Sequence, residues 1–483
     1  MVENNKNYLE FLSAEEVRRI HSESLSILEE TGVKVLHDDA LNWFADAGAR
    51  VDFANRRVRI PGDMVETYMA KAPESFTVHA SADGAADLEL KPGKVNFVTT
   101  HGIPFVYDLE TGERRQSSCD DARAFSKLSD SLINLADAYC VFHPLDVQNH
   151  AIHAHIVHAQ IENSGKPIKG RINGKQIAED CLKMAEMVAG GKKALAEKPI
   201  LHALVSSLSP LTMDNVQIEG MAEYIRAGQP VNLSAAIGAG STGPVTLVGT
   251  MVLLTTEILA HGVLAQIIKP GAPIMYGSAS STIDMRNASL RYGAVESGML
   301  SSAVAQMSRF YKIPCRVSAG ATDSKMLDMQ AGFESSMNLL MAALSGASYI
   351  SNAAGAVDLA LTASYEKLVI DHEIISSIVR VIRGISVNDE TLSGDLIKSV
   401  GPGGQFLTAK HTFSNFKKEI FFPGLVDSGP YQAWEGAENK DIKDRAREMV
   451  KTILRKHEGP SRDEKLLKEL EAYVKSVDDR VVA

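Results

Sequence analysis

From about residue 95 onward, the chain alternates short β-prone runs with long helical stretches that are amphipathic or apolar. Several runs follow a helix-end signal built from Gly and Pro, as in residues 227–230 and 269–273. Short buried strands with helices between them indicate parallel strands joined by βαβ units. We count eight such runs: Val95–Thr100, Leu135–Val141, Pro167–Lys169, Ile200–Val205, Pro230–Leu233, Pro273–Tyr276, Cys315–Ser318 and Ser348–Ile350.

Eight strand–helix units in about 270 residues predict an α/β fold of the (β/α)8 TIM-barrel type. An open doubly wound sheet is the alternative. It would be favoured by a GxGxxG loop after the first strand, which the sequence lacks. We expect three regions: an N-terminal helical and mixed cap over residues 1–94, the barrel core over 95–400, and a C-terminal extension over 401–483.

Both flanks of the predicted barrel have patterns of their own. Ser13 and Glu16 form a capping box ahead of a helix that ends near Gly32. Residues 33–95 are mixed and turn-rich, which predicts a cap with a few small strands. The final helix, Asp463–Val477, has one apolar side and is expected to pack on the barrel or on a partner subunit.

Composition narrows the function classes. Of 483 residues, 50 are basic and 60 acidic, so the net charge of −10 argues against a general nucleic-acid binder. The N-terminus lacks a signal sequence, and the longest apolar stretch, 245–268, contains polar residues that favour a buried helix over a membrane span. No CxxC pair occurs, and scattered thiols suit a reducing cytoplasm; the cysteines are Cys119, Cys140, Cys181 and Cys315.

Functional residues of barrels collect at the carboxyl ends of the strands. That rule predicts site residues without any comparison, and aromatic residues are frequent among them and in neighbouring loops (Phe105, Tyr107, Phe142, Tyr276). Paired catalytic carboxylates are absent, because no second acid lies in the loop of Asp323. The residues at the predicted strand ends are His101, Phe142, His143, Arg171, Ser206, Ser207, Ser234, Tyr276, Ser278, Thr322, Asp323, Ser351 and Asn352.

Other motifs carry weaker signals. The histidines at 150, 153, 155 and 158 suggest metal binding, but they do not share one helical face and have no HExxH motif, which favours hydrogen-bonded helix residues. For His101 and His143, a role in the site and a structural hydrogen bond both remain open. Gly401–Gly404 lacks the Gly-Lys-Ser/Thr of a phosphate-binding loop. Asp284–Arg286, with Glu296 beyond it, follows the sixth strand and is a candidate for shaping the site.

Several motifs occur together over nearly the whole chain. They are Leu28–Val33, Asp284–Arg286, Thr322–Lys325 leading into Gln330–Glu334, Ser364–Asp371, and Gly403–Leu407 with His411 and Thr412. In this combination the chain resembles the trimethylamine methyltransferase family, and specifically its members without pyrrolysine. The family's fold is a (β/α)8 barrel, which agrees with the strand count.

The resemblance also implies a reaction. Members specific for trimethylamine carry pyrrolysine after the eighth strand, where this chain has standard residues at 351–355. The resemblance to members without pyrrolysine therefore implies demethylation of a quaternary amine. Glycine betaine is the first choice of substrate, and proline betaine and carnitine are the alternatives. The methyl acceptor would be cob(I)alamin (a corrinoid cofactor) on a separate corrinoid protein, and no metal of the chain's own is expected. Asp427-Ser428-Gly429 departs from the family, where Arg is expected after Asp.

Under this interpretation each predicted site residue receives a role. A quaternary ammonium has no lone pair, so the enzyme must hold one methyl in line with its acceptor. Aromatic faces bind such cations by about 0.5–2 kcal/mol each, and a carboxylate needs donors such as Arg171 or His143. Asn352 and Asp323 are the catalytic candidates. The substrate-binding candidates are His101, Phe105, Tyr107, Phe142, His143, Arg171, Tyr276 and Glu296, and the cofactor-binding candidates are Gly403, Gly404 and His411.

Partner expectations follow from the same interpretation. We expect a corrinoid protein and a small quaternary amine as partners, no nucleic acid or membrane, and a homo-oligomer in the cytoplasm. Two other classes remain open: a betaine-binding barrel that has lost turnover, and a metal-dependent barrel hydrolase that uses the histidine cluster.

Overall fold

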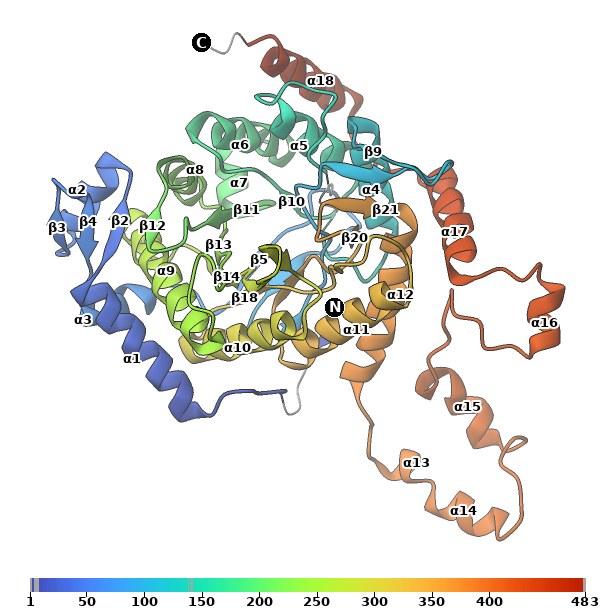
Figure 1. Ribbon diagram of the computed structural model, residues 1–483. Coiled ribbons are helices and arrows are strands. Elements are labelled where there is room, and N and C mark those ends of the chain that lie inside the picture. Colours follow the sequence, from blue (N-terminus) through green and yellow to red (C-terminus); the bar gives the residue numbers. More distant parts are fainter. Residues whose placement is uncertain (1, 4–7, 138, 140–141, 481–483) are drawn as a thin grey trace.

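A curled parallel sheet lies at the centre of the protein, whose computed structural model describes residues 2–3, 8–137, 139 and 142–480. Single parallel bridges join Phe97 to Ile350 on one side and to Leu135 on the other, so two further segments continue the sheet. Helices surround it (Figure 1). In order, the six paired strands are β10 (Ile168–Lys169), β11 (Leu201–Ser206), β13 (Val231–Ala235), β15 (Ile274–Ser278), β18 (Cys315–Ser318) and β19 (Tyr349–Ser351).

The predicted alternation of parallel strands and helices is confirmed. Six of the eight predicted runs coincide with the six strands within one or two residues, and the bridges at Phe97 and Leu135 fall in the other two. The second run, Leu135–Val141, lies partly outside the described residues, as does Cys140. The helices around the sheet are α4 (Cys119–Ser131), α5 (Ile152–Asn163), α6 (Lys175–Ala189), α7 (Lys192–Glu197), α8 (Asn215–Arg226), α9 (Leu247–Ile268), α10 (Val295–Tyr311), α11 (Met329–Leu344) and α12 (Tyr365–Arg383).

Helix α9 is apolar on every side because other helices cover it. It packs against α1 (Ala14–Glu30), α8 and α10 as well as the sheet, and its residues are mostly buried. Among the described residues it is the one helix long and apolar enough to cross a membrane. Its burial inside the protein confirms the predicted core helix.

The N-terminal region places helices and small strands at one side of the sheet (Figure 1). Ser13 and Glu16 make the predicted capping box at the start of α1 (Ala14–Glu30). Gly32 follows with a φ of 75°, and a Cβ there would lie 2.2 Å from the carbonyl oxygen of Val58. The other elements are β1 (Val2–Glu3), β2 (Val33–Val35), α2 (Asp38–Asp46), β3 (Arg50–Asp52), β4 (Arg57–Arg59), α3 (Gly62–Met69), β5 (Phe76–Val78), β6 (Leu88–Leu90) and β7 (Lys94–Val95).

The loops after the sheet strands contain small strands, which the sequence pattern does not predict. One group pairs β8 with β9 and β21, and another pairs β16 with β14 and β17. Each is two to four residues long, which is too short to show a two-residue period. Their bounds are β8 (Phe105–Tyr107), β9 (Arg114–Gln116), β12 (Thr212–Met213), β14 (Gly238–Ala239), β16 (Ser281–Asp284), β17 (Ser289–Arg291), β20 (Ala356–Val357) and β21 (Thr362–Ser364).

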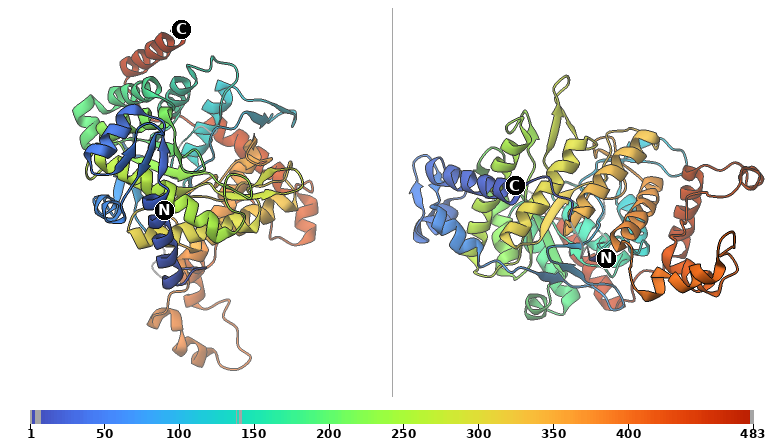
Figure 2. Two further views of the ribbon diagram at one scale, coloured as in Figure 1. Left: turned by 60° about the vertical axis from the view of Figure 1, so that its left-hand side comes forward. Right: turned by 90° about the horizontal axis from the view of Figure 1, so that it is seen from below.

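Beyond α12 the chain leaves the body as an arm, residues 384–440, which projects in all three ribbon views (Figures 1 and 2). The arm holds α13 (Asp389–Leu392), α14 (Gly394–Val400), α15 (Lys410–Glu419) and α16 (Tyr431–Gly436), and none of these helices has a buried residue. The chain then returns to the body. Helix α17 (Ile442–Lys456) packs on α12 and α4, and α18 (Glu464–Asp478) packs on α5 and α6.

Candidate functional site

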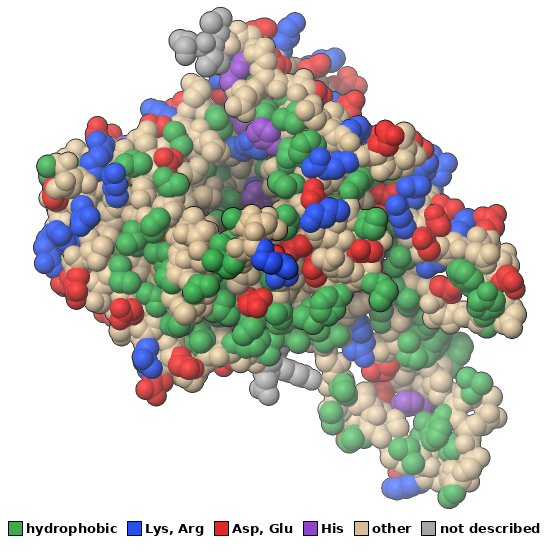
Figure 3. Space-filling model, in the orientation of Figure 1, with side chains coloured by type: hydrophobic (Ala, Val, Ile, Leu, Met, Phe, Trp, Pro, Cys, Tyr) green, Lys and Arg blue, Asp and Glu red, His purple; other side chains and the backbone are tan. Residues whose placement is uncertain are grey.

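The face onto which the sheet strands point their carboxyl ends is hollowed. Figure 3 shows a depression at the centre of the view, with histidine side chains in its depth. Among the predicted residues, His101, His143, Arg171 and Asn352 follow a strand or bridged segment of the sheet at this end. Parallel strands bring their carboxyl ends to one edge, so residues far apart in sequence meet here.

Asn352 joins the ends of two strands. It follows β19 with a φ of 57°, a left-handed conformation that Asn tolerates better than most residues. Its Oδ1 accepts a hydrogen bond from the Thr100 hydroxyl at 2.8 Å, and its Nδ2 donates to the Ser318 hydroxyl at 2.7 Å. A Cβ at Gly320 would lie 2.7 Å from the Asn352 carbonyl oxygen, so this close approach requires glycine. The amide is therefore held in one orientation.

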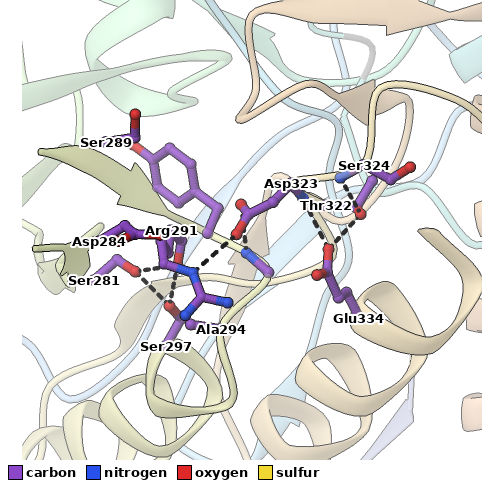
Figure 4. A network of polar contacts seen from close by, with 12 residues as sticks. Ser281, Asp284, Ser289, Arg291, Ala294, Ser297, Thr322, Asp323, Ser324 and Glu334 are labelled. Carbon is purple, nitrogen blue, oxygen red and sulfur yellow. Dashed lines mark hydrogen bonds and ion pairs between the residues drawn. The ribbon is translucent and has the colours of Figure 1, made fainter. Parts of the chain in front are cut away.

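Asp323 lies in a polar network between β17 and α11 (Figure 4). It accepts a hydrogen bond from the Gly293 amide at 2.9 Å and pairs with Arg291 at 3.7 Å. Burial raises the pKa of Asp323, and the charge of Glu334 adds to this rise. Glu334 accepts from the Thr322 hydroxyl at 2.5 Å and from the Asp323 amide at 2.8 Å. The prediction considered only acids within the loop of Asp323, so it missed Glu334, which approaches this loop from α11.

The sequence-based prediction did not include Glu334, because this residue lies eleven positions after Asp323, in a helix rather than in the loop. Its contact with the loop depends on how α11 returns across the sheet end. Glu296, another predicted residue, lies half-buried in the first turn of α10. It neighbours Ser297, whose hydroxyl donates to the Arg291 carbonyl at 2.9 Å and joins the same network (Figure 4).

Two of the predicted aromatic residues lie on the small strand β8. The guanidinium of Arg114 covers the ring of Phe105 at 3.7 Å, so that face already holds a cation. The hydroxyl of Tyr107 donates to the carbonyl oxygen of Lys325 in the neighbouring loop. Both residues are half-buried.

The other two predicted aromatic residues pack in the apolar core. Phe142 is fully buried, with its ring edge-on to Phe125 at 4.7 Å. The Tyr276 hydroxyl shares a 2.6 Å hydrogen bond with Thr255 of α9, and its ring stacks on Tyr311 of α10. The Tyr276 side chain thus faces the helices rather than the inside of the sheet. The structure does not bring the four aromatic candidates into one cage.

His101, His143 and Arg171 do lie near one another, after strands or bridged segments of the sheet. A 3.2 Å hydrogen bond joins Nη2 of Arg171 to Nδ1 of His143, and burial and Arg171 lower the pKa of His143. His101 keeps a buried Nδ1 without a partner. Burial holds the pKa of His101 well below its usual value, and the charges of Lys169, Arg316 and Arg171 add to this effect.

Two cations inside the sheet are absent from the predicted set. Lys169 of β10 and Arg316 of β18 are 3% and 1% exposed. Burial lowers the pKa of Lys169 to about 7 and that of Arg316 to about 10. The Lys169 ammonium lies 4.8 Å from the ring centre of Tyr139. The sequence contains a signal for both residues, because each is a charged residue inside an otherwise buried strand. The prediction missed them because it considered only residues in the loops that follow the strands.

The histidines near residue 150 bind neighbours rather than one another. His150 contacts the Val477 carbonyl at 3.1 Å, His153 bonds to Asp180 at 2.9 Å, and His155 bonds to Asp478 at 2.9 Å. They attach α18 and neighbouring elements to α5, which confirms the hydrogen-bonded interpretation. Across the described ranges, no group of three or more His, Cys, Asp or Glu side chains is arranged to hold a metal ion.

The predicted cofactor residues lie on the arm, apart from the strand ends (Figure 1). Gly403 and Gly404 are exposed, and His411 of α15 is hydrogen-bonded to the Ser393 hydroxyl at 3.0 Å. The structure therefore separates these three residues from His101, Arg171 and Asn352.

A curled parallel sheet with a hollowed carboxyl end is typical of α/β enzymes, whose sites lie among the strand-end loops. The chain belongs to the trimethylamine methyltransferase (MTTB) family, whose model matches residues 1–481, and it is a methyltransferase.

Similar proteins match nearly the whole chain. A glycine betaine methyltransferase of Desulfitobacterium hafniense (strain Y51) is 36% identical over 96% of both chains. The trimethylamine methyltransferase MttB of Desulfitobacterium hafniense (strain DSM 10664 / DCB-2) is 33% identical, over 97% of this chain and 94% of that one. The crystal structure of the Methanosarcina barkeri monomethylamine methyltransferase MtmB covers 99% of this chain and 90% of that chain, with a TM-score of 0.47 and 12% identity.

Proposed function

We propose that this methyltransferase takes a methyl group from a small betaine, glycine betaine first, and passes it to the corrinoid of a separate protein. The observation that carries the choice of substrate is the positive interior, where Lys169 and Arg316 lie buried near Arg171. A betaine brings a carboxylate to these cations, whereas trimethylamine has none. The identity to a glycine betaine methyltransferase supports the same choice. Proline betaine and carnitine carry the same two charged groups and are the alternative substrates.

The residues of this chain bind and orient the substrate. A quaternary nitrogen cannot be protonated, so catalysis consists of alignment and exclusion of water. Asn352, whose amide oxygen and nitrogen are both hydrogen-bonded, positions the substrate, and Asp323, held by the Gly293 amide and by Arg291, is the second catalytic residue of the proposal. The reduced cobalt of the corrinoid supplies the methyl acceptor. His101, His143 and Arg171 line the entrance in this proposal.

We further propose that the sheet forms a closed barrel and that a corrinoid protein binds at its hollowed face. The segments at Phe97 and Leu135 would close the sheet into a (β/α)8 barrel, with the core over 95–400 between the cap and the C-terminal extension. The open hollow leaves room for an acceptor carried by another protein (Figure 3). Gly403, Gly404 and His411 lie on the arm, apart from the hollow, so we do not include them in the proposed contact with the corrinoid protein, which we place in the cytoplasm.

The arm supports a homo-oligomer. Eleven large hydrophobic residues between Ile385 and Tyr431 are exposed, and Leu425 is the arm's single buried residue. At roughly 100 Å² each, these side chains offer on the order of 1,000 Å², which exceeds the roughly 800 Å² per partner of a standard interface. The arm has nearly balanced charge, which gives a strongly charged partner little to recognise. We therefore propose a second copy of this chain as its occupant.

The reaction is tested with purified enzyme, cob(I)alamin and a panel of quaternary amines. Glycine betaine should give methylcobalamin, seen by its absorbance, and an equal amount of dimethylglycine. If only proline betaine or carnitine is turned over, that compound is the substrate in place of glycine betaine, and the proposed reaction stays the same. Binding of a betaine without any turnover would instead favour a non-catalytic betaine-binding protein.

A further inference from the structure

Two cations lie inside the sheet without an acidic partner. Arg316 and Lys169 are almost fully buried, and neither forms an ion pair with any residue that the structure describes. Asp137, whose charge acts on Lys169, is itself buried and accepts a 2.7 Å hydrogen bond from the Tyr349 hydroxyl. Removing charge from water is unfavourable unless an opposite charge compensates it. An anion at this position would supply that charge.

The guanidinium of Arg316 extends toward the carboxyl ends of the strands. Its Nη1 donates to the Ser234 hydroxyl at 3.2 Å and to the Ser278 carbonyl at 3.1 Å, at the ends of β13 and β15. Its Nε is buried and has no partner. Arg316 lies opposite Gly277, where a Cβ would come within 2.6 Å of Oδ1 of Asn232. Glycine at this position lets the Asn232 side chain lie against the backbone of β15.

Further unpartnered polar atoms face the same interior. Both side-chain amide atoms of Asn232 and both ring nitrogens of His202 are buried without a hydrogen-bond partner, as is Nδ1 of His101. His202 lies opposite Lys169 in the pairing of β10 with β11. Buried polar atoms are nearly always satisfied in folded proteins, so a cluster of exceptions indicates a site whose ligand completes it.

We propose that Arg316, assisted by Lys169, is the receptor for the substrate carboxylate and selects betaines over amines that lack one. This inference rests on the proposed methyl transfer and names the residue that sets its substrate class. A carboxylate binds a guanidinium through two parallel hydrogen bonds, and the edge of Arg316 that carries Nε is available for one of them. The Ser234 and Ser278 contacts hold the opposite side of the guanidinium in place.

Arg171, the donor expected from the strand-end rule, is less suited to this role. It is half-buried at the rim, and its Nη2 already contacts His143. A carboxylate at Arg171 would keep part of its hydration, whereas one at Arg316 would be bound away from water. Electrostatic attraction is stronger in the drier position.

Calorimetric titration with glycine betaine and choline tests the receptor, because both carry a trimethylammonium group and only the first has a carboxylate. The native enzyme should bind glycine betaine at least about 100-fold more tightly than choline. Arg316→Gln should lower the affinity for glycine betaine by about 100-fold and the affinity for choline by less than threefold. Equal weakening of both ligands, or unchanged binding of glycine betaine, would overturn the assignment.

The matched control is Arg226→Gln on α8, outside the sheet, where the native side chain pairs with Glu223 in partial exposure. It should bind both ligands as the native enzyme does. If Arg316→Gln does not fold, Arg316→Lys, which keeps the charge and loses the planar fork, should still weaken glycine betaine at least about tenfold. Unchanged affinity in that variant would also contradict the receptor.

Binding of acetate, measured by the same titration, distinguishes an error in the assignment of Arg316 from an error in the proposed methyl transfer. If no quaternary amine binds or reacts, the methyl-transfer proposal fails, and acetate then tests Arg316 alone. Binding of acetate to the native enzyme, lost in Arg316→Gln, would retain the carboxylate receptor. Absence of acetate binding to the native enzyme would then exclude it.

Discussion

The interior of the sheet and the arm depart from the usual burial pattern in opposite directions. The interior buries Arg316 and Lys169 without an ion pair among the described residues, whereas the arm exposes eleven large hydrophobic residues. Buried charges are normally paired, and large exposed apolar surfaces normally mark interaction sites. Each region is therefore incomplete by itself. The interior lacks a small anion, and the arm lacks an apolar protein surface.

A partnered cation elsewhere in the core gives the reference for this comparison. Lys367 of α12 is 2% exposed and pairs with Asp371, one turn further along the helix. It also donates to the Ser335 hydroxyl at 2.9 Å, and Asp371 accepts from the Gly355 amide at 2.9 Å. This pair is complete within the chain. Its function is structural, unlike that of Arg316.

The largest expected effect follows from breaking that pair. Asp371→Asn should lower the free energy of unfolding by about 3–5 kcal/mol, because it leaves the Lys367 charge buried without compensation. Urea unfolding followed by circular dichroism measures the change. The control is Asp395→Asn on the arm, an exposed partner of Lys398, which should change stability by less than about 0.5 kcal/mol. Similar effects at the two sites would contradict the distinction between core and arm.

A second prediction concerns the arm. Leu407 and Phe413 are 79% and 80% exposed, and the double variant Leu407→Asp, Phe413→Asp would place two charges in the proposed interface. We expect the dissociation constant of the oligomer to rise by at least about 100-fold, or about 3 kcal/mol, measured by sedimentation equilibrium. Ile133→Asp, at an exposed position on the body, should leave the oligomer unchanged. A monomeric native protein at micromolar concentration would rule out the interface.

The strand pattern predicts most of the fold but less of the site, and Tyr276 and Arg316 show why. Both lie on short buried runs, and these runs are correctly placed as strands. Every residue of β15 and β18 is buried, so no alternation of polar and apolar positions reveals which side chains face inward. The pairing register places Arg316 toward the strand ends and Tyr276 toward α9 and α10. That information belongs to the assembled sheet.

Glu334 and the Gly401–Gly404 loop show two further limits. Glu334 reaches Asp323 only because α11 returns across the sheet end, a contact between a helix and a loop that local spacing does not encode. The glycine-rich loop has the composition of a ligand cradle, yet it lies on the arm because the chain leaves the body after α12. In both cases the neighbours of a residue depend on long-range packing, which local motifs do not encode.

The smallest predicted effect, on pH dependence, tests whether Lys169 acts with Arg316. Burial lowers the pKa of Lys169 to about 7, so the free enzyme loses this charge as the pH rises through neutrality. A carboxylate favours the protonated form, and the affinity for glycine betaine should therefore fall about tenfold, or about 1.4 kcal/mol, between pH 6 and pH 8.5. Calorimetric titration across this range measures it. The titratable groups around Lys169 are Asp137, His101, His202, Arg316, Tyr139 and Tyr349.

The histidines and Arg316 do not explain the slope. Burial raises the pKa of Asp137, and loss of its proton would also weaken carboxylate binding, so a Lys169 variant is needed to separate the two groups. Burial lowers the pKa of His202 to about 3 and that of His101 well below its usual value, and it leaves Arg316 at about 10. Lys169→Met should therefore remove the pH dependence of binding, whereas a slope that persists would assign it elsewhere. Stability should change in the opposite sense. The unfolded chain binds more protons than the folded one between pH 7 and 10.5, so folding stability rises with pH there, and this rise should be smaller in Lys169→Met.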